Sequence, residues 1–304
     1  MQSIAWDEND TAAWGAGPHR ARHALHELDQ WSAPQLAEIL DTIPRASIHA
    51  YTMGRDPEAR STWQRGSIGG LTGADLVQAV ETGHLWLNVI GIHSQCDRIA
   101  RTVDSLYAQI GAATGWTHDE LKSTLLISSP SAQVFYHADN QPNALWHLRG
   151  KKRVYVYPAG EPFISSDQLD RIAAGQADEQ LPYTKELDDS ATVIDLAPGD
   201  VAWWPQNRPH RVENTSGVNV SLSVEHRTPE STDLERVQMA NFYLKHHAGI
   251  APLQVTSAPA VKKPAIAAAR VLRRVGRGSS PKGEIPVTFV VDLSAPNCVK
   301  ALDS

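Results

Sequence analysis

The stretch between residues 125 and 225 restricts the fold more than any other part of the 304-residue chain. It consists of short β-prone runs, such as residues 133–136, separated by turn-forming runs such as Ser-Ser-Pro-Ser at 128–131. It has neither the heptads of coiled coils nor the strand–helix alternation of parallel sheets. We therefore expect a mainly β protein whose core is a jelly roll (double-stranded β-helix), two sheets closed on each other, with helices flanking it at both ends.

Two histidines and an aspartate in this stretch have the composition of a metal site. His137 and Asp139 are two residues apart, so both side chains leave the same face of an extended chain. His210 follows a turn and a short strand at 197–205. Taken singly, each of these residues is more often a solvated or hydrogen-bonded part of a strand. Together, two histidines and one carboxylate are the facial triad that binds Fe(II) and leaves positions open, so we predict one metal site with these three ligands.

The segments HADNQPNALWHLRGKKRVYVYP (137–158) and LAPGDVAWWPQNRPHRVEN (196–214) make the pattern more specific. They resemble the core of the JmjC/cupin-like 2-oxoglutarate oxygenases, asparaginyl hydroxylases in particular. Shared features are the His-x-Asp, an Asn four residues later, a Gly-x-Lys turn and a Gly-Asp-Val…Pro…His run, and the resemblance covers residues 120–228. It implies Fe(II) as the metal, 2-oxoglutarate and O2 as cosubstrates, and hydroxylation of a protein side chain or a small metabolite, with release of succinate and CO2.

Lys152 is the candidate for binding 2-oxoglutarate. It shares strand parity with Val154 and Val156, so it is predicted to point inward, where a lysine is unfavourable unless an anion meets it. The resemblance implies the same residue for the distal carboxylate of 2-oxoglutarate. Lys151 is the other candidate for this role, but it has the strand parity of Arg153. A further alternative is that both lysines are solvated residues of a turn.

Three more residues are expected near 2-oxoglutarate. The resemblance places Asn143 there, although a turn residue is the alternative. Ser221 and Ser223 lie on the polar face of a strand at 218–225, which either lines the pocket or meets solvent. Val134 stands where the asparaginyl hydroxylases have a threonine, so the details of cosubstrate binding are expected to differ.

Four residues next to the triad in sequence are predicted to line the substrate entrance, because loops at a barrel mouth commonly carry specificity. They are Tyr136, Trp146, Trp204 and Arg208. The acidic loop at 175–190 lies between the two halves of the triad, where a lid would be placed.

The rest of the chain is expected to surround this core. We divide it into an N-terminal flank of helices and strands (1–120), the core with the metal site (121–228) and a C-terminal helical region with a basic segment and a final strand (229–304). Helices are expected near 33–43, 72–82, 99–110, 167–174 and 230–247.

The C-terminal region leaves two choices open. The apolar side of the helix at 230–247 either forms a homodimer or packs on its own barrel. The segment from Lys262 to Lys282 is basic but has no recognition motif, and the net charge is −6, so a solvated helix is expected and no nucleic-acid partner. No apolar run approaches a membrane span and two cysteines make no disulfide framework, so we expect a cytoplasmic protein.

Two other functions compete with the hydroxylase. A cupin-like barrel without turnover would be a binding or sensor module, but the intact triad and the candidate lysine favour catalysis. A methyl-lysine demethylase would use the same chemistry, but the sequence shows no reader domain, zinc cluster or aromatic cage.

Overall fold

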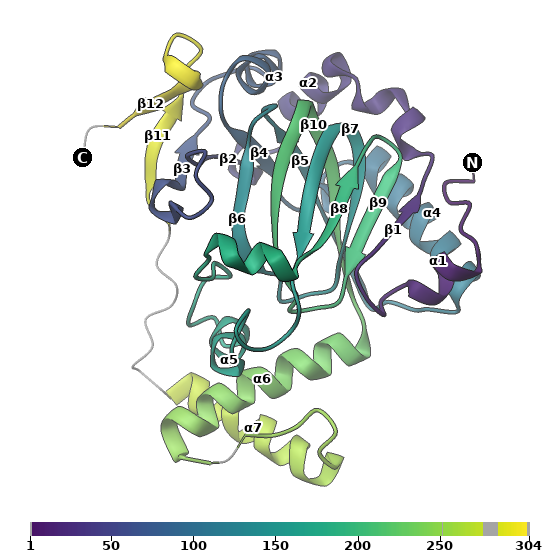
Figure 1. Ribbon diagram of the computed structural model, residues 1–304, viewed down its shortest axis with the longest axis vertical. Coiled ribbons are helices and arrows are strands. Elements are labelled where there is room, and N and C mark those ends of the chain that lie inside the picture. The colour runs from purple at the N-terminus through teal and green to yellow at the C-terminus, as the bar shows by residue number, and fades with distance from the viewer. Residues whose placement is uncertain (1, 251, 276–284, 303–304) are drawn as a thin grey trace.

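Strands of two sheets form the centre of the computed structural model, which describes residues 2–250, 252–275 and 285–302 (Figure 1). The larger sheet contains, in spatial order, β1 (His19–Arg22), β9 (Asp200–Trp204), β7 (Asn143–Val156), β10 (Pro209–Arg227), β5 (Glu120–Ser128), β4 (Trp86–Val89), β2 (Ile48–Thr52), β3 (Gln64–Ser67), β11 (Val287–Val291) and β12 (Val299–Ala301). On the smaller sheet, β6 (Gln133–Ala138) pairs with β10 and β8 (Thr192–Leu196) pairs with β7. All these pairs are antiparallel except β11 with β3.

The long strands β7 and β10 belong to both sheets. The first half of β7 pairs with β9 and its second half with β8, while β10 pairs first with β6 and then with β5. Each bends at a glycine with positive φ, Gly150 (φ 79°) and Gly217 (φ 67°). A Cβ on Gly150 would lie 2.6 Å from the carbonyl oxygen of Val218, so the two strands also approach too closely there for a side chain.

The first of these bends corrects the sequence analysis. The Gly-x-Lys segment that contains Gly150 was interpreted as a turn, but Gly150, like Gly217, lies inside one continuous strand. A glycine in the left-handed region looks the same in sequence whether the chain reverses there or only bends. Here it lets one strand pass from one sheet to the other, which closes the roll around its interior.

Seven helices of the described residues flank the sheets. They are α1 (Glu8–Ala13), α2 (Ala33–Thr42), α3 (Gly73–Thr82), α4 (Asp97–Thr114), α5 (Ser166–Ala173), α6 (Pro229–Ala248) and α7 (Pro259–Val275). The five helices predicted from sequence are confirmed with small shifts at their ends. α3 shows why: Thr72 accepts a hydrogen bond from the Asp75 amide and the Asp75 carboxylate accepts one from the Thr72 amide, a reciprocal cap that is legible in sequence.

Two apolar groups hold the helices in place. Residues of α2, α3 and α4, such as Leu36, Leu76 and Leu106, are fully buried in one core with Ile127 and Leu222 of the larger sheet. At the other end of the molecule, α6 packs between α5 and α7 (Figure 1). The apolar residues of α6 are thus covered by neighbouring helices of the same chain.

The two termini extend the larger sheet. β2 and β4 of the N-terminal part pair with each other and, through β4, with β5, while β11 pairs with β3. The expected final strand near residues 285–293 is confirmed. The basic segment forms α7 as far as Val275, and its last two cations, Arg277 and Lys282, lie outside the described residues. Within the described ranges, no helix combines the length and the apolar character needed to cross a membrane.

Candidate metal centre and its cavity

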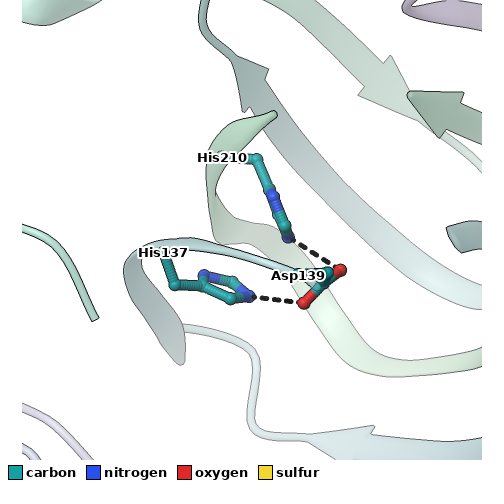
Figure 2. Close-up of side chains that lie close together, drawn as sticks. All are labelled: His137, Asp139 and His210. Carbon is teal, nitrogen blue, oxygen red and sulfur yellow. Dashed lines mark ion pairs between the residues drawn. The ribbon is translucent and has the colours of Figure 1, made fainter. Parts of the chain in front are cut away.

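The three predicted metal ligands meet where the smaller sheet begins. His137 is near the end of β6, Asp139 follows that strand, and His210 is near the start of β10, directly opposite His137 in the strand register. The Asp139 carboxylate lies between the two imidazoles, 3.6 Å from Nε2 of His137 and 3.5 Å from Nε2 of His210 (Figure 2). One ligand atom from each residue lies within 4.8 Å of the others, which is compact enough for a shared ion.

Backbone carbonyl groups fix the orientation of both imidazoles. The Nδ1 atoms of His137 and His210 lie 2.8 Å and 3.0 Å from the carbonyl oxygens of Phe135 and Arg208. Because a carbonyl can only accept, each Nδ1 carries the proton and each Nε2 presents its lone pair toward Asp139. Such a bond to the second ring nitrogen is what positions metal-binding histidines in proteins.

The protonation states suit a divalent metal as well. Burial, and then the neighbouring His137, lower the pKa of His210 to about 4. Burial alone would raise the pKa of Asp139, but the two histidines and the Asn143 amide outweigh it and lower that pKa. At neutral pH the site therefore offers neutral His210 and a carboxylate, a donor set that fits Fe(II) or a related transition metal.

A cavity of about 330 Å³ opens beside these ligands, between the two sheets. This is at the lower end of the size range of small-molecule sites. The wall residues come from the inner faces of several strands: β5, β6, both halves of β7, and both halves of β10. The strands that carry the triad therefore also build the space in which a cosubstrate would lie.

Lys152 lines this cavity, as its strand parity predicted. Its side chain is buried, whereas Lys151 is exposed. Among the described residues, no carboxylate lies within the 4.0 Å of an ion pair from its amine, and burial lowers the pKa of Lys152 to about 7. A buried amine without an acidic partner is suited to receive an anion. The role of Lys152 in binding 2-oxoglutarate stays a prediction.

The other three residues expected near 2-oxoglutarate separate into two groups. Asn143 and Ser223 line the cavity: the Asn143 amide donates to Asp139 at 3.1 Å, and the Ser223 hydroxyl donates to Asn143 at 2.9 Å. Ser221 does not line it, and its hydroxyl lies 3.0 Å from Nδ1 of the buried His147. Asn143 and Ser223 thus steady the carboxylate ligand.

The substrate residues chosen by sequence proximity are only partly placed at the cavity. Trp204 lines it, with its ring 4.5 Å from that of His210. Arg208 is half-buried at the neighbouring loop, where it donates to the carbonyl of Tyr157 at 3.4 Å, and it does not line the cavity.

Tyr136 and Trp146 require a correction, because both side chains leave the opposite faces of their strands. Tyr136 packs edge-on against Tyr157 at 4.8 Å and donates to the carbonyl of Phe163. Trp146 is fully buried in the main core, stacked on Trp6 at 6.3 Å. Neither lines the cavity, so neither is a candidate substrate contact.

The sequence analysis missed most of the outer cavity wall. Tyr51, Trp63 and Trp86 come from the N-terminal part of the chain, and Glu225 from the end of β10. Their approach depends on the pairing of β2 with β4 and of β4 with β5, for which the sequence holds no local signal. The loop predicted as a lid does reach the site: residues 178–180 line the cavity and bond to the backbone of β6.

Fold and site together define a jelly-roll barrel with a two-histidine, one-carboxylate triad beside an internal cavity. Solved structures with this fold are found among oxygenases. The chain superposes on the X-ray structure of Escherichia coli YcfD with a TM-score of 0.53 and 14% identity, covering 89% of this chain and 68% of that one.

Two further structures of the same Escherichia coli protein agree. YcfD described as a ribosomal oxygenase in complex with cobalt and 2-oxoglutarate gives a TM-score of 0.53 at 15% identity, over 89% of this chain and 67% of that one. Another ribosomal oxygenase YcfD structure gives 0.52 at 13% identity, over 97% and 76%. No protein-family model and no curated protein sequence matches the chain. The likeness confirms the predicted fold, a jelly-roll core with flanking helices.

Proposed function

We propose that this protein is an Fe(II)- and 2-oxoglutarate-dependent oxygenase that hydroxylates a protein side chain or a small metabolite. The observation that carries the proposal is the presence of a complete triad and a buried, acid-free lysine in the same cavity. The 2-oxoglutarate and cobalt bound by the structurally similar Escherichia coli oxygenase support it.

The residues that line the site have separate roles in this proposal. His137, Asp139 and His210 hold the metal from one side, and Lys152 binds the distal carboxylate of 2-oxoglutarate. When bound, Fe(II) supplies the O2-dependent oxidation of 2-oxoglutarate to succinate and CO2 that drives hydroxylation. Asn143 orients Asp139 through its 3.1 Å hydrogen bond, and the Trp204 ring excludes water beside His210.

The test is a comparison of His210→Ala with the parent protein. Metal stoichiometry is measured after loading with Fe(II), or with Mn(II) or Co(II) as substitutes, and succinate is measured under air with 2-oxoglutarate. We expect one metal per chain and succinate formation in the parent, and loss of both in the variant. Undiminished metal binding by His210→Ala contradicts the site, and binding of both ligands without any succinate would favour the binding or sensor module.

The setting of the enzyme is part of the same proposal. A protein substrate is compatible with the ribosomal oxygenase named above, and the cytoplasm, which keeps Fe(II) reduced, is the compartment we propose. The homodimer through the C-terminal helices stays a prediction. Although α6 is covered by α5 and α7, Val261 and Val271 of α7 are 55% and 57% exposed. Light scattering of the purified protein measures whether two chains form a dimer.

A further inference from the structure

A second hollow lies away from the metal ligands, where α6 packs between α5 and α7 (Figure 1). Its volume is about 140 Å³, against about 330 Å³ for the cavity beside the metal ligands. This is too small for most small-molecule sites and suits a single charged group. Its side chains come from the end of β10, from α6 and from α7: Arg227, Thr232, Glu235, Arg236, Met239 and Arg273.

The helical repeat explains why these residues meet. The four that belong to α6 are spaced i, i+3, i+4 and i+7, so they share one face of that helix. Arg227 is the last residue of β10, and Arg273 approaches from α7, which packs on α6. The hollow therefore depends on the packing of three elements, and its arginines come from all three.

The three arginines are unequally compensated. Nη2 of Arg227 lies 2.9 Å from a carboxylate oxygen of Glu235, and its Nε lies 3.8 Å from one of Glu120. Among the described residues, no Asp or Glu oxygen lies within 4.0 Å of the guanidinium of Arg236 or of Arg273. Two guanidinium groups at the hollow thus carry a positive charge without a close counter-charge.

The Arg273 guanidinium is directed toward α6 by a weak contact. Its Nη1 donates to the sulfur of Met239 at 3.7 Å, and a thioether is a poor acceptor. An anionic oxygen in the hollow would be a much stronger acceptor for the same N–H groups.

The α6 wall of the hollow is fixed by the loops that carry the metal ligands. The carboxylate of Glu235 also accepts a hydrogen bond, at 2.9 Å, from the amide of Gln141, two residues after Asp139. One turn further along α6, the Gln238 side chain accepts a hydrogen bond from Asn207 at 3.3 Å, in the loop that leads to the last metal ligand. Because this wall is held from behind, little ordering is required of it when a ligand binds.

We propose that this hollow binds a phosphate dianion, free or as the monoester of a small molecule, between Arg236 and Arg273. The inference goes beyond the proposed function, since none of these residues lines the metal cavity. A phosphate monoester carries nearly two negative charges at neutral pH, which matches the two uncompensated guanidinium groups. The planar fork of arginine donates to two phosphate oxygens at once, and the Thr232 hydroxyl adds a donor.

The test measures the binding of inorganic phosphate, glycerol phosphate and acetate by calorimetric titration. The protein is first loaded with one equivalent of Zn(II) and with 2-oxoglutarate, so that the metal cavity is filled. We expect a phosphate to bind with a dissociation constant of about 1 mM or lower, and acetate at least about tenfold more weakly. Tighter binding of glycerol phosphate identifies a monoester as the ligand, and tighter binding of inorganic phosphate identifies the free ion.

Two variants and a matched control locate the site. Arg236→Met and Arg273→Met each remove one uncompensated charge and are expected to weaken phosphate binding at least about tenfold. Arg274→Met removes the neighbouring charge of the same helix, which does not line the hollow, and is expected to leave the affinity within about twofold. All three arginines are exposed, so the variants should fold, and their unfolding temperatures check this.

Glu235→Gln gives an effect of opposite sign. It removes the carboxylate that competes with phosphate for Arg227, while the new amide oxygen still accepts from Gln141. Phosphate should therefore bind about threefold or more tightly than to the parent protein. Weaker binding to Glu235→Gln would contradict a site at this hollow.

Three further results would overturn the inference. Equal loss of affinity in Arg274→Met and Arg273→Met would indicate the general charge of α7 and no defined site. Acetate that binds as tightly as phosphate would contradict the ligand assignment, and so would a single-stranded oligonucleotide that binds in preference to both phosphates. Failure to bind Zn(II) or 2-oxoglutarate would overturn the proposed function alone, because the phosphate titration can then be made on the metal-free protein.

Discussion

Two buried cations on neighbouring strands of the barrel have opposite surroundings. Arg211 of β10 and Lys152 of β7 are each 4% exposed. Arg211 lies on the outer face of the smaller sheet, where it forms ion pairs with Asp188 and Glu213, and its guanidinium lies 3.5 Å from the Tyr155 ring centre. Lys152 faces the cavity and has no acidic partner among the described residues.

The difference separates structure from function. Arg211 is compensated on several sides, and its partner Asp188 belongs to the segment that leads away from the cavity-lining residues 178–180, so the cluster attaches that segment to the strand of His210. Lys152 has been removed from water without compensation, which is unfavourable to folding unless a ligand restores the balance. A buried cation that is paired with carboxylates has a structural role. A buried cation without a carboxylate partner indicates a binding site.

The largest effect is expected from Arg211→Met. Removing one partner of a buried pair leaves Asp188 uncompensated, so we expect a loss of about 3–5 kcal/mol in the free energy of unfolding, measured in urea. Arg153→Met is the control, since its pair with Asp195 is exposed to solvent and such pairs contribute less than about 1 kcal/mol. Equal losses in the two variants would contradict a structural role for the Arg211 cluster.

Lys152→Met is expected to act on binding and not on stability. Loss of a charge-assisted hydrogen bond, about 1.5–3 kcal/mol, should weaken 2-oxoglutarate binding about tenfold to about a hundredfold. Without ligand the variant should be as stable as the parent or more so, because it no longer buries an amine. Calorimetric titration of metal-loaded protein measures the first effect and urea unfolding the second. Unchanged 2-oxoglutarate affinity would remove Lys152 from the site.

The lowered pKa of Lys152 predicts a pH dependence that an ordinary lysine would not give. With that pKa at about 7 in the free protein, the amine is neutral above pH 7 and must take up a proton to pair with a carboxylate. Affinity for 2-oxoglutarate should therefore fall as pH rises above about 7, by up to about tenfold per pH unit. Titration at several pH values in buffers of different ionisation enthalpy counts the proton. Lys152→Arg, which stays charged, should show neither the fall nor the uptake.

The features that could be predicted from the sequence depend on the geometry of residues close together in the chain. His137 and Asp139 are two residues apart, which predicted that they share one face, and Lys152 shares the parity of Val154 and Val156, which predicted that it points inward. All three line the cavity. Helix caps such as that of α3 are likewise local. These features depend on the residues within one element, and a single sequence contains them.

Errors arose where strands bend. Before Gly150 the odd-numbered residues Asn143 and Leu145 face the cavity, whereas after it the even-numbered Lys152 does. The residues that face inward therefore change from odd to even numbers at the bend. Trp146 has the parity of Lys152 and faces away. β10 changes in the opposite sense across Gly217. Parity cannot be counted across a glycine bend, because the bend itself is set by the closure of the two sheets.

The aromatic residues of the outer cavity wall could not be predicted from the sequence, for a different reason. Tyr51, Trp63 and Trp86 precede the triad by more than fifty residues, and only long-range pairing brings them to it. Such pairing is stabilised by the core as a whole, and no motif marks it. The N-terminal part was expected to contain helices and strands, but the sheet that its strands would join was not predicted.

The smallest effect is expected from Lys151→Ala, and it tests the strand register itself. Lys151 precedes Lys152 by one residue and is exposed, so its loss should change the free energy of unfolding by less than about 0.5 kcal/mol. The 2-oxoglutarate affinity should stay within about twofold of the parent, since a solvated amine on the outer side contributes little to a buried anion. Both are measured beside Lys152→Met. If the two variants exchange their behaviour, the inward parity after Gly150 is displaced by one residue, and Lys151 is the cation that the cavity holds.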